Sequence, residues 1–207
     1  MNFVPRIRTA VQAFAPYTAG ESIESVRERF GLSRIIKMAS NENPLGMSPK
    51  ARQAVEKAVS GVERYPDQFD LISKVAERCG VAQNQVVLGN GSNDVLDLVA
   101  RVFLAPGRSA VFAQHAFAVY PLATLSTGAE LIATPAKNYG HDLDAIRAAI
   151  RPDTRIVWIA NPNNPTGNFL PYAEVRTFLA SVPKDVVVVL DEAYNEYIPA
   201  AERIDTA

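Results

Sequence analysis

Apolar and polar positions along the chain follow helical and extended periods in turn. Up to residue 47 the pattern is irregular, with one helix expected over residues 22–30 and one short strand over residues 35–38. A further helix begins at Pro49, with Ser48 as its N-cap. From there on, helical and extended segments alternate. We expect the later helices at residues 69–79, 93–103, 118–127, 142–150 and 172–182, and strands at residues 85–88, 109–112, 130–134, 155–160 and 186–190.

This alternation of strand and helix predicts the fold class. Strands that are joined through helices form mostly parallel sheets, and the helices then cover both faces. The strand at residues 186–190 is apolar at all five positions, so it is expected to be the most buried of the set. We therefore predict an α/β fold with a mostly parallel central sheet and helices on both faces.

Composition narrows the function classes. The 207 residues include 21 Lys and Arg against 22 Asp and Glu, a net charge of -1, so neither a nucleic-acid footprint nor a cationic membrane face is expected. The 48% of hydrophobic residues is typical of a soluble globular protein. With no membrane-length apolar run and no apolar signal segment at the start, we expect a cytoplasmic protein. The single cysteine, Cys79, argues against a disulfide framework or a cysteine-built zinc site, and we expect no metal.

A glycine turn before a predicted helix is the first candidate for chemistry. Its sequence is G-N-G-S-N-D, from Gly89 to Asp94. Free N–H groups at a helix N-terminus attract anions, and glycine lets a phosphate approach the backbone. Asp94 stands where the dinucleotide fingerprint requires its last glycine. The segment therefore fits a small phosphate better than a dinucleotide, and a plain strand-to-helix turn is the alternative.

Two further candidate segments follow predicted strands. The loop N-P-N-N-P-T-G, residues 161–167, offers three carboxamides where open α/β sheets bind their ligands. Asp191 follows the apolar strand 186–190, where a carboxylate is costly to bury without a cationic partner. A protonated ring nitrogen would satisfy Asp191, and Tyr194 can offer its phenol to the same ring. A pyridine cofactor is thus one interpretation, and an ordinary strand end reached by solvent is the other.

Taken in order, these three segments resemble the pyridoxal-phosphate aminotransferases of fold type I. Further motifs are similar to those of the histidinol-phosphate aminotransferase family: P-Y at Pro16, N-E-N-P-x-G at Asn41, R-Y-P at Arg64 and F-x-x-Y at Phe117. The resemblance extends to about Tyr197. It implies the large domain of fold type I and pyridoxal 5'-phosphate as cofactor. It also implies transamination between histidinol phosphate or imidazole-acetol phosphate and glutamate or 2-oxoglutarate, in histidine biosynthesis.

The resemblance implies a role for each matching residue. Backbone N–H groups of the glycine turn would hold the cofactor phosphate, and Phe117 would stack on the pyridine ring. Asp191 would pair with the ring nitrogen, while Asn164 and Tyr194 would hydrogen-bond the ring hydroxyl. The cofactor-binding residues implied in this way are Gly91, Ser92, Asn93, Phe117, Asn164, Asp191, Tyr194 and Tyr65.

A homodimer is implied as well. Tyr65 is similar to the tyrosine that reaches the cofactor phosphate of the neighbouring subunit. Tyr17 would contact the substrate phosphate, and Asn43 would line the substrate pocket. Apart from this small-molecule substrate, no nucleic-acid or membrane partner is expected. By the same resemblance, residues 1–47 form an N-terminal arm that contributes to a small domain, and residues 48–207 form an incomplete large domain whose C-terminal small domain is absent.

The Schiff-base lysine of the family pattern has no counterpart in this sequence. Family members use a lysine that follows the strand ending in D-E-A-Y to form a Schiff base with the cofactor. All six lysines of this chain precede Asp191, and Ser73-Lys74 lies before the glycine turn, which is the wrong order. We therefore expect a truncated chain that is inactive alone, and we assign no catalytic residue.

Two alternatives remain open for the function. Another fold type I enzyme, such as an aromatic aminotransferase or a phosphothreonine decarboxylase, would share the cofactor residues. Tyr17 and the loop at residues 41–46 favour a phosphate-bearing substrate over the former. The other alternative is a non-catalytic protein that has kept the cofactor site.

Several single residues also have a simpler interpretation. Phe117 and Tyr120 suit a hydrophobic core, and Tyr65 suits a turn. His141, beside Asp142, is interpreted as the neighbour of a helix cap. Cys79 is interpreted as a packing residue.

Overall fold

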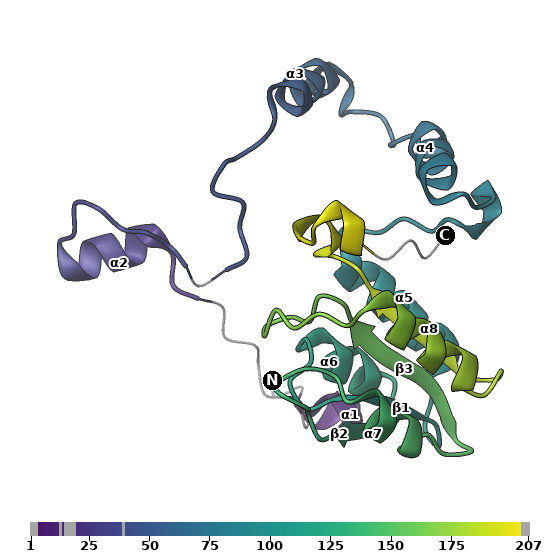
Figure 1. The fold of residues 1–207 in the computed structure, drawn as a ribbon. Coiled ribbons are helices and arrows are strands. Elements are labelled where there is room, and N and C mark those ends of the chain that lie inside the picture. Colours follow the sequence, from purple (N-terminus) through teal and green to yellow (C-terminus); the bar gives the residue numbers. More distant parts are fainter. Residues whose placement is uncertain (1–3, 13, 15–19, 39, 204–207) are drawn as a thin grey trace. The chain divides into compact units, whose positions relative to one another are not determined.

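A computed structural model describes residues 4–12, 14, 20–38 and 40–203 (Figure 1). The chain divides into two units. Unit 1 comprises Met1–Phe14 and Leu71–Ala207 and contains the sheet, whereas unit 2 comprises Ala15–Asp70. The boundary between the two falls within helix α4 (Phe69–Cys79).

The sheet of unit 1 has four parallel strands in the order β2-β1-β3-β4. A helix lies between each strand and the next along the chain, which is the connection that parallel pairing requires. This arrangement confirms the predicted α/β fold with a mostly parallel sheet. The strands are β1 (Ser109–Ala113), β2 (Glu130–Thr134), β3 (Thr154–Ala160) and β4 (Val187–Asp191).

Helices cover both faces of the sheet, as predicted (Figure 1). Successive strand residues point to opposite faces, so Trp158 and Ile159 of β3 belong to different hydrophobic clusters. The cluster of Trp158 includes Tyr120 of α6 and residues of α5, and the cluster of Ile159 includes Ile146 of α7 and Phe178 of α8. The covering helices are α5 (Ser92–Phe103), α6 (Val119–Ser126), α7 (Leu143–Ala148) and α8 (Tyr172–Ser181).

Two predicted strands are wrong, and a third is less buried than predicted. Residues 35–38 are irregular, and residues 85–88 consist of the end of a 3-10 helix and irregular backbone. Both segments are apolar enough for a strand, but no described strand pairs with either of them, and isolated strands are not stable. The last strand, β4, is half-buried at every position because it lies at the edge of the sheet, whereas β1 is buried throughout.

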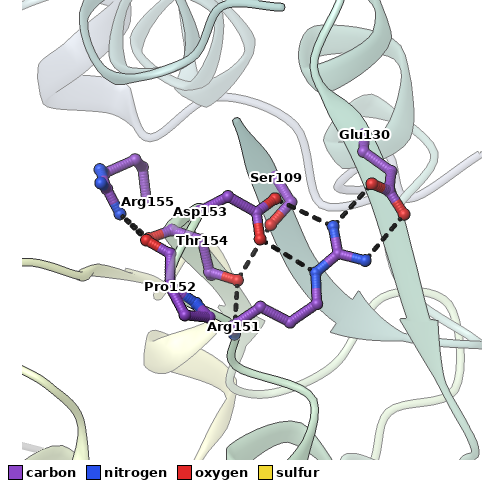
Figure 2. Close-up of polar contacts among 7 residues, drawn as sticks. All are labelled: Ser109, Glu130, Arg151, Pro152, Asp153, Thr154 and Arg155. Atoms are coloured by element: carbon purple, nitrogen blue, oxygen red, sulfur yellow. Dashed lines mark hydrogen bonds and ion pairs between the residues drawn. The ribbon is translucent and has the colours of Figure 1, made fainter. Parts of the chain in front are cut away.

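A polar network joins three strands at their amino ends (Figure 2). The guanidinium of Arg151 donates to both oxygens of Glu130, at 3.0 and 2.6 Å, and to both oxygens of Asp153, at 3.1 and 2.9 Å. The hydroxyl oxygens of Ser109 and Thr154 lie 2.9 Å apart. Hydrogen bonds from Arg151 lower the pKa of the Glu130 and Asp153 carboxyls, and the same bonds raise the pKa of Arg151. The network therefore ties β1, β2 and β3 together where they begin.

The other described elements of unit 1 are short. None of the helices in the described ranges is long and apolar enough to cross a membrane. Cys79, at the end of α4, is exposed, so its interpretation as a packing residue is wrong. The short elements are η1 (Val4–Arg6), α1 (Thr9–Gln12), η3 (Gln83–Gln85), η4 (Asn195–Tyr197) and η5 (Ala200–Glu202).

Unit 2 contains helices, but its described residues include no strand and no buried side chain. Ser22 and Ser48 cap its two α-helices, each accepting the backbone N–H three residues further on, at 3.1 and 3.2 Å. Both helix starts confirm the prediction from sequence, because N-cap signals act locally. The helices of unit 2 are α2 (Ile23–Phe30), α3 (Pro49–Ala58) and η2 (Val59–Gly61).

Candidate cofactor site

The carboxyl edge of the sheet brings together residues from three strand ends. Phe117 follows β1, the loop at residues 161–167 follows β3, and Asp191 is the last residue of β4. Because the strands are parallel, these ends lie at one edge of the sheet. Ala160 pairs in register with Asp191, and the N–H of Asn161 donates to the Asp191 carbonyl at 2.9 Å. The loop after β3 therefore begins beside the Asp191 backbone.

The carboxylate of Asp191 is held by two hydrogen bonds from the protein. Its Oδ2 accepts the hydroxyl of Tyr120 at 3.0 Å, and its Oδ1 accepts the backbone N–H of Ala193 at 3.1 Å. Burial, followed by the charge of Asp191, raises the pKa of the Tyr120 phenol far above its usual range, so the phenol remains a donor. Sequence reasoning expected a cationic partner for Asp191 and missed Tyr120. The structure supplies a neutral donor and leaves part of the half-buried carboxylate free to accept another.

Tyr120 is itself fixed by aromatic contacts. Its ring lies parallel to the indole of Trp158, with 5.4 Å between centroids and 5° between planes. The indole Nε1–H donates to the hydroxyl of Thr124 at 3.2 Å. Phe117 meets Tyr120 edge to face, with the centroids 5.9 Å apart, and remains half-buried. Tyr120 therefore belongs to the core, as one interpretation had it, and contacts the candidate site as well.

Two of the three loop asparagines hold the loop itself. Asn161 is buried and exchanges two hydrogen bonds with the backbone of Leu170, at 3.0 and 2.8 Å. Asn163 is also buried, and its Nδ2 donates to the carbonyl of His115 at 2.9 Å and to the hydroxyl of Thr166 at 2.8 Å. These bonds fix the loop, whose two Asn–Pro peptide bonds are cis. The third asparagine of the loop is Asn164.

Asn164 and Tyr194 form a polar pair next to these groups. The Nδ2 of Asn164 lies 3.5 Å from the phenol oxygen of Tyr194, and both residues are half-buried. One comes from the loop after β3 and the other from the segment after β4. The structure thus brings together Asn164, Tyr194 and Asp191 at neighbouring strand ends.

The glycine turn forms the N-terminus of α5. Gly91 precedes the helix with φ 77°, a conformation that favours glycine. The N–H of Asn90 donates to the Asp94 carboxylate at 2.9 Å, which closes the turn. Ser92 and Asn93 begin the helix and are exposed, so the N–H groups of the first turn are accessible to an anion.

Three predicted site residues are not among the described residues of unit 1. Tyr65 and Asn43 belong to unit 2, where Tyr65 is fully exposed and Asn43 shapes a turn. The Oδ1 of Asn43 accepts the N–H of Leu45 at 3.0 Å, and its Nδ2 donates to the carbonyl of Gly46 at 3.2 Å. Tyr17 lies outside the described residues. Within unit 1, Asn164, Tyr194 and Asp191 come to neighbouring strand ends, and Phe117 lies against Tyr120.

His141 is a buried residue whose place sequence reasoning missed. Its Nε2 lies 2.9 Å from the carbonyl oxygen of Ala160, the last residue of β3, and burial lowers the pKa of its imidazole. Its neighbour Asp142 caps α7, as expected, by accepting the N–H groups of Asp144 and Ala145. No periodicity marks such a histidine, because its partner lies 19 residues further along the chain.

A cavity of about 630 Å³ lies between α7 and α8, and none of the predicted site residues lines it. Its walls carry charges of both signs, including Lys137, Arg147 and Glu174. Within the described residues no group of three or more His, Cys, Asp or Glu is placed to hold a metal ion.

These residues fit a phosphorylated pyridine. The Asp191 carboxylate keeps accepting capacity beyond its two protein donors, which suits a ring N–H. Phe117 offers an aromatic surface, the pair of Asn164 and Tyr194 offers donors for a ring oxygen, and the N-terminus of α5 offers a place for the phosphate.

The chain matches a known family along most of its length. The family model for aminotransferase class I and II matches residues 33–206. Histidinol-phosphate aminotransferase 1 of Dechloromonas aromatica is 77% identical over 209 residues, covering 100% of this chain and 58% of that protein. The protein of the same name from Thiobacillus denitrificans is 57% identical, covering 95% of this chain and 52% of that protein. The chain thus spans little more than half the length of these relatives.

Solved structures share the fold. The histidinol-phosphate aminotransferase of Sinorhizobium meliloti, crystallised in complex with pyridoxal-5'-phosphate, matches with a TM-score of 0.85 at 24% identity, covering 96% of this chain and 54% of that one. An aspartate aminotransferase single mutant of Thermus thermophilus matches with a TM-score of 0.72 at 22% identity, covering 91% of this chain and 53% of that one. At such identities the likeness shows the fold, which agrees with the parallel sheet predicted from sequence.

Proposed function

The chain belongs to the aminotransferase class I and II family, and on that premise we propose that it is the cofactor-binding part of a histidinol-phosphate aminotransferase that uses pyridoxal 5'-phosphate. The observation that carries the proposal is the Asp191 carboxylate, held by Tyr120 and Ala193 beside Asn164 and Tyr194. High identity to curated histidinol-phosphate aminotransferases supports the same assignment. The activity is that of histidine biosynthesis, exchanging an amino group between histidinol phosphate and 2-oxoglutarate.

Each residue of the site has a separate task in this proposal. Asp191 binds the ring N–H and keeps the ring nitrogen protonated through a charge-assisted hydrogen bond. Phe117 stacks on the ring and excludes water from one side of it. Asn164 and Tyr194 hydrogen-bond the ring hydroxyl. When bound, the cofactor supplies an electron sink for the carbanion that forms at the substrate α-carbon.

The phosphate of the cofactor is assigned to the start of α5. We assign the phosphate to the backbone N–H groups of Gly91, Ser92 and Asn93 at the helix N-terminus, where the partial positive charge of the helix favours an anion. The N–H of Gly91 also donates to the carbonyl of Gly89, at 2.9 Å. Gly89 permits this turn, because a Cβ there would lie 2.8 Å from the Cβ of Asp94. The contribution of Ser92 and Asn93 is therefore mainly that of the backbone.

The residues of unit 2 and the N-terminal segment keep their predicted roles as part of the proposal. Tyr65 reaches the cofactor phosphate of a partner subunit in a homodimer, which suits a side chain that is fully exposed within its own chain. Tyr17 and Asn43 contact the substrate. Residues 1–47 serve as an arm of a small domain, and residues 48–207 serve as part of the large domain.

In this proposal, transamination requires a chain longer than these 207 residues. The lysine that the family resemblance requires after Asp191 has no counterpart up to Ala207, and the last lysine of the sequence is Lys184. That lysine would hold the cofactor covalently and move a proton at the substrate α-carbon. We therefore expect the 207 residues to bind pyridoxal phosphate without transaminating.

The intact mass of the protein from its own cells, followed by a substrate panel, tests the proposed activity. A mass nearly double that of the 207 residues is expected, together with faster turnover of histidinol phosphate than of phenylalanine when 2-oxoglutarate is the acceptor. Equal rates with both amino donors would point to an aromatic aminotransferase and contradict the substrate. Release of carbon dioxide from phosphothreonine would identify a decarboxylase. A mass matching the 207 residues, together with cofactor binding but no turnover, would support the alternative of a non-catalytic protein that binds the cofactor.

A further inference from the structure

We propose that Tyr120 is a positioning residue for the cofactor ring, acting through the carboxylate of Asp191. This inference rests on the proposed function, because it assigns the ring nitrogen to Asp191. Tyr120 and Asp191 are 71 residues apart in sequence, and the hydrogen bond between them joins α6 to the end of β4. Tyr120 does not itself touch the cofactor ring in this proposal.

The carboxylate needs such a partner because of where β4 lies. This strand is at the edge of the sheet and is half-buried at every position, so packing alone does not fix the Asp191 side chain. The backbone N–H of Ala193 restrains one oxygen, at 3.1 Å. The hydroxyl of Tyr120 restrains the other, at 3.0 Å. With both oxygens held, rotation of the carboxylate costs at least one hydrogen bond.

Tyr120 is suited to this task because its own ring cannot move easily. The side chain is fully buried and lies parallel to the indole of Trp158, with 5.4 Å between ring centroids. Trp158 is itself fully buried, so its place depends mainly on packing. Since Trp158 lies in β3 and Ala160 of that strand pairs with Asp191, the phenol is anchored to the strand next to its target.

The chemistry of the pair fits the same role. A neutral phenol stabilises a carboxylate without neutralising its charge, so the charge remains available to a protonated ring nitrogen. A cationic partner at this position would compete with the ring for that charge. Each carboxylate oxygen has two lone-pair directions, and one donor on each leaves a free direction for the ring N–H. Tyr120 thereby orients Asp191 and leaves its charge for the cofactor.

The test compares Tyr120→Phe with Thr124→Val in the 207-residue chain. Tyr120→Phe keeps the ring on Trp158 and removes only the hydroxyl that reaches Asp191. Thr124→Val removes a buried hydroxyl from the same helix, one that accepts a hydrogen bond from Trp158 instead of donating to Asp191. Both variants lose one side-chain hydrogen bond of a buried residue on α6, so a purely structural role predicts similar behaviour for the two.

The first readout is the ¹⁵N resonance of bound pyridoxal phosphate labelled at its ring nitrogen, measured together with its dissociation constant. The wild type and Thr124→Val are expected to show the protonated ring nitrogen. Tyr120→Phe is expected to shift the resonance towards the neutral value and to raise the dissociation constant about ten-fold, which corresponds to about 1.4 kcal/mol. An unchanged resonance in Tyr120→Phe, or an equal shift in both variants, would overturn the inference.

The second readout does not depend on the cofactor. Crystal structures of the wild type and of Tyr120→Phe, both without added cofactor, are expected to show the Asp191 carboxylate rotated away from its wild-type direction in the variant alone. An Asp191 that keeps its place would overturn the positioning role. Failure of the wild type to bind pyridoxal phosphate would instead count against the proposed function, and the two crystal structures would still decide the role of Tyr120.

Discussion

Unit 1 packs its helices on a sheet, whereas the helices of unit 2 depend on their own caps. In unit 1 the side chains of Trp158, Tyr120 and Ile146 are completely buried. In unit 2 no described side chain is buried, and Leu45 and Tyr65 are among its exposed hydrophobic residues. The two units nevertheless show equally clear helix signals in the sequence.

This difference shows that the signals that place a helix are not the interactions that stabilise it. A cap and a helical apolar period predict where a helix begins, but the free energy that holds most helices comes from an apolar face buried against something else. Unit 1 contains both halves of its core within the described residues, on both faces of the sheet. The described residues of unit 2 include apolar side chains but no buried core. Paired substitutions, one in each unit, put this contrast to the test.

The largest contrast is expected from truncating an apolar side chain in each unit. Trp158→Ala removes a fully buried indole from between the sheet and α6, so we expect a loss of about 3–5 kcal/mol in the free energy of unfolding. Leu45→Ala changes a side chain that is 92% exposed, so we expect a change within about 0.5 kcal/mol. Urea unfolding, followed by far-UV circular dichroism, measures both. Comparable losses in the two variants would show that Leu45 is covered after all and would remove the contrast.

An intermediate effect is expected from adding a methyl group to a glycine in each unit. At Gly89 the new Cβ would lie 2.8 Å from the Cβ of Asp94 and 3.1 Å from the Cγ2 of Val95, so Gly89→Ala should cost about 1–3 kcal/mol. At Gly61 the new Cβ would point into open space, so Gly61→Ala should be neutral or stabilise by up to about 1 kcal/mol. Amide hydrogen exchange, read in α5 and in α3, assigns each effect to its own unit. A stable Gly89→Ala variant with unchanged protection in α5 would show that the turn can move to accept the methyl group.

The smallest contrast is expected between two arginines. Arg151 bonds two carboxylates and lowers the pKa of both Glu130 and Asp153, so their contribution to stability is present above the usual carboxyl pKa values and is lost as pH falls through the lowered ones. Arg151→Met should therefore lower stability at pH 7 and flatten its acid dependence below about pH 4.5. Arg29→Met breaks a lone exposed pair with Glu21 in unit 2 and should leave that dependence unchanged.

Urea midpoints at pH 7 and at pH 3 are sufficient for this comparison. The network of Arg151 is an exposed one, so its effect should be measurable but modest. Parallel acid profiles for Arg151→Met and the wild type would contradict a stabilising role for the network. A change in the pH dependence of stability in Arg29→Met would mean that the single ion pair with Glu21 matters as much as the Arg151 network does.

Much of the fold was predictable because its signals are local. Ser48 and Pro49 mark the start of α3, and the last four strands were placed correctly to within about two residues. The two wrong strands, at residues 35–38 and 85–88, have apolar sequences but no described partner strand. Pairing is a property of distant residues, and a short apolar run does not contain that information. For the same reason the edge position of β4 could not be read from its five apolar residues.

The candidate site likewise has features that the sequence predicted and features that only the structure shows. Asp191, Phe117, Asn164 and Tyr194 were identified from their motifs, and the structure brings them to one edge of the sheet. The hydrogen bond from Tyr120 to Asp191 spans 71 residues and leaves no trace in any local pattern. The same holds for the bond between Asn163 and the His115 carbonyl, which spans 48 residues. Motifs thus indicate which groups we propose for cofactor binding, whereas the groups that hold them in place emerge from the fold.

Binding of pyridoxal phosphate to the 207-residue chain tests the cofactor site most directly. The comparison is between the wild type, Asp191→Asn at the end of β4 and Asp185→Asn just before it, where Asp185 is a mostly exposed partner of Arg155. Dissociation constants come from absorbance titration. We predict that the wild type and Asp185→Asn bind alike and that Asp191→Asn binds at least about ten-fold more weakly, because it loses a charge-assisted hydrogen bond to the ring nitrogen. Equal binding by all three proteins, or no binding by the wild type, would contradict the assignment of this edge of the sheet as the cofactor site.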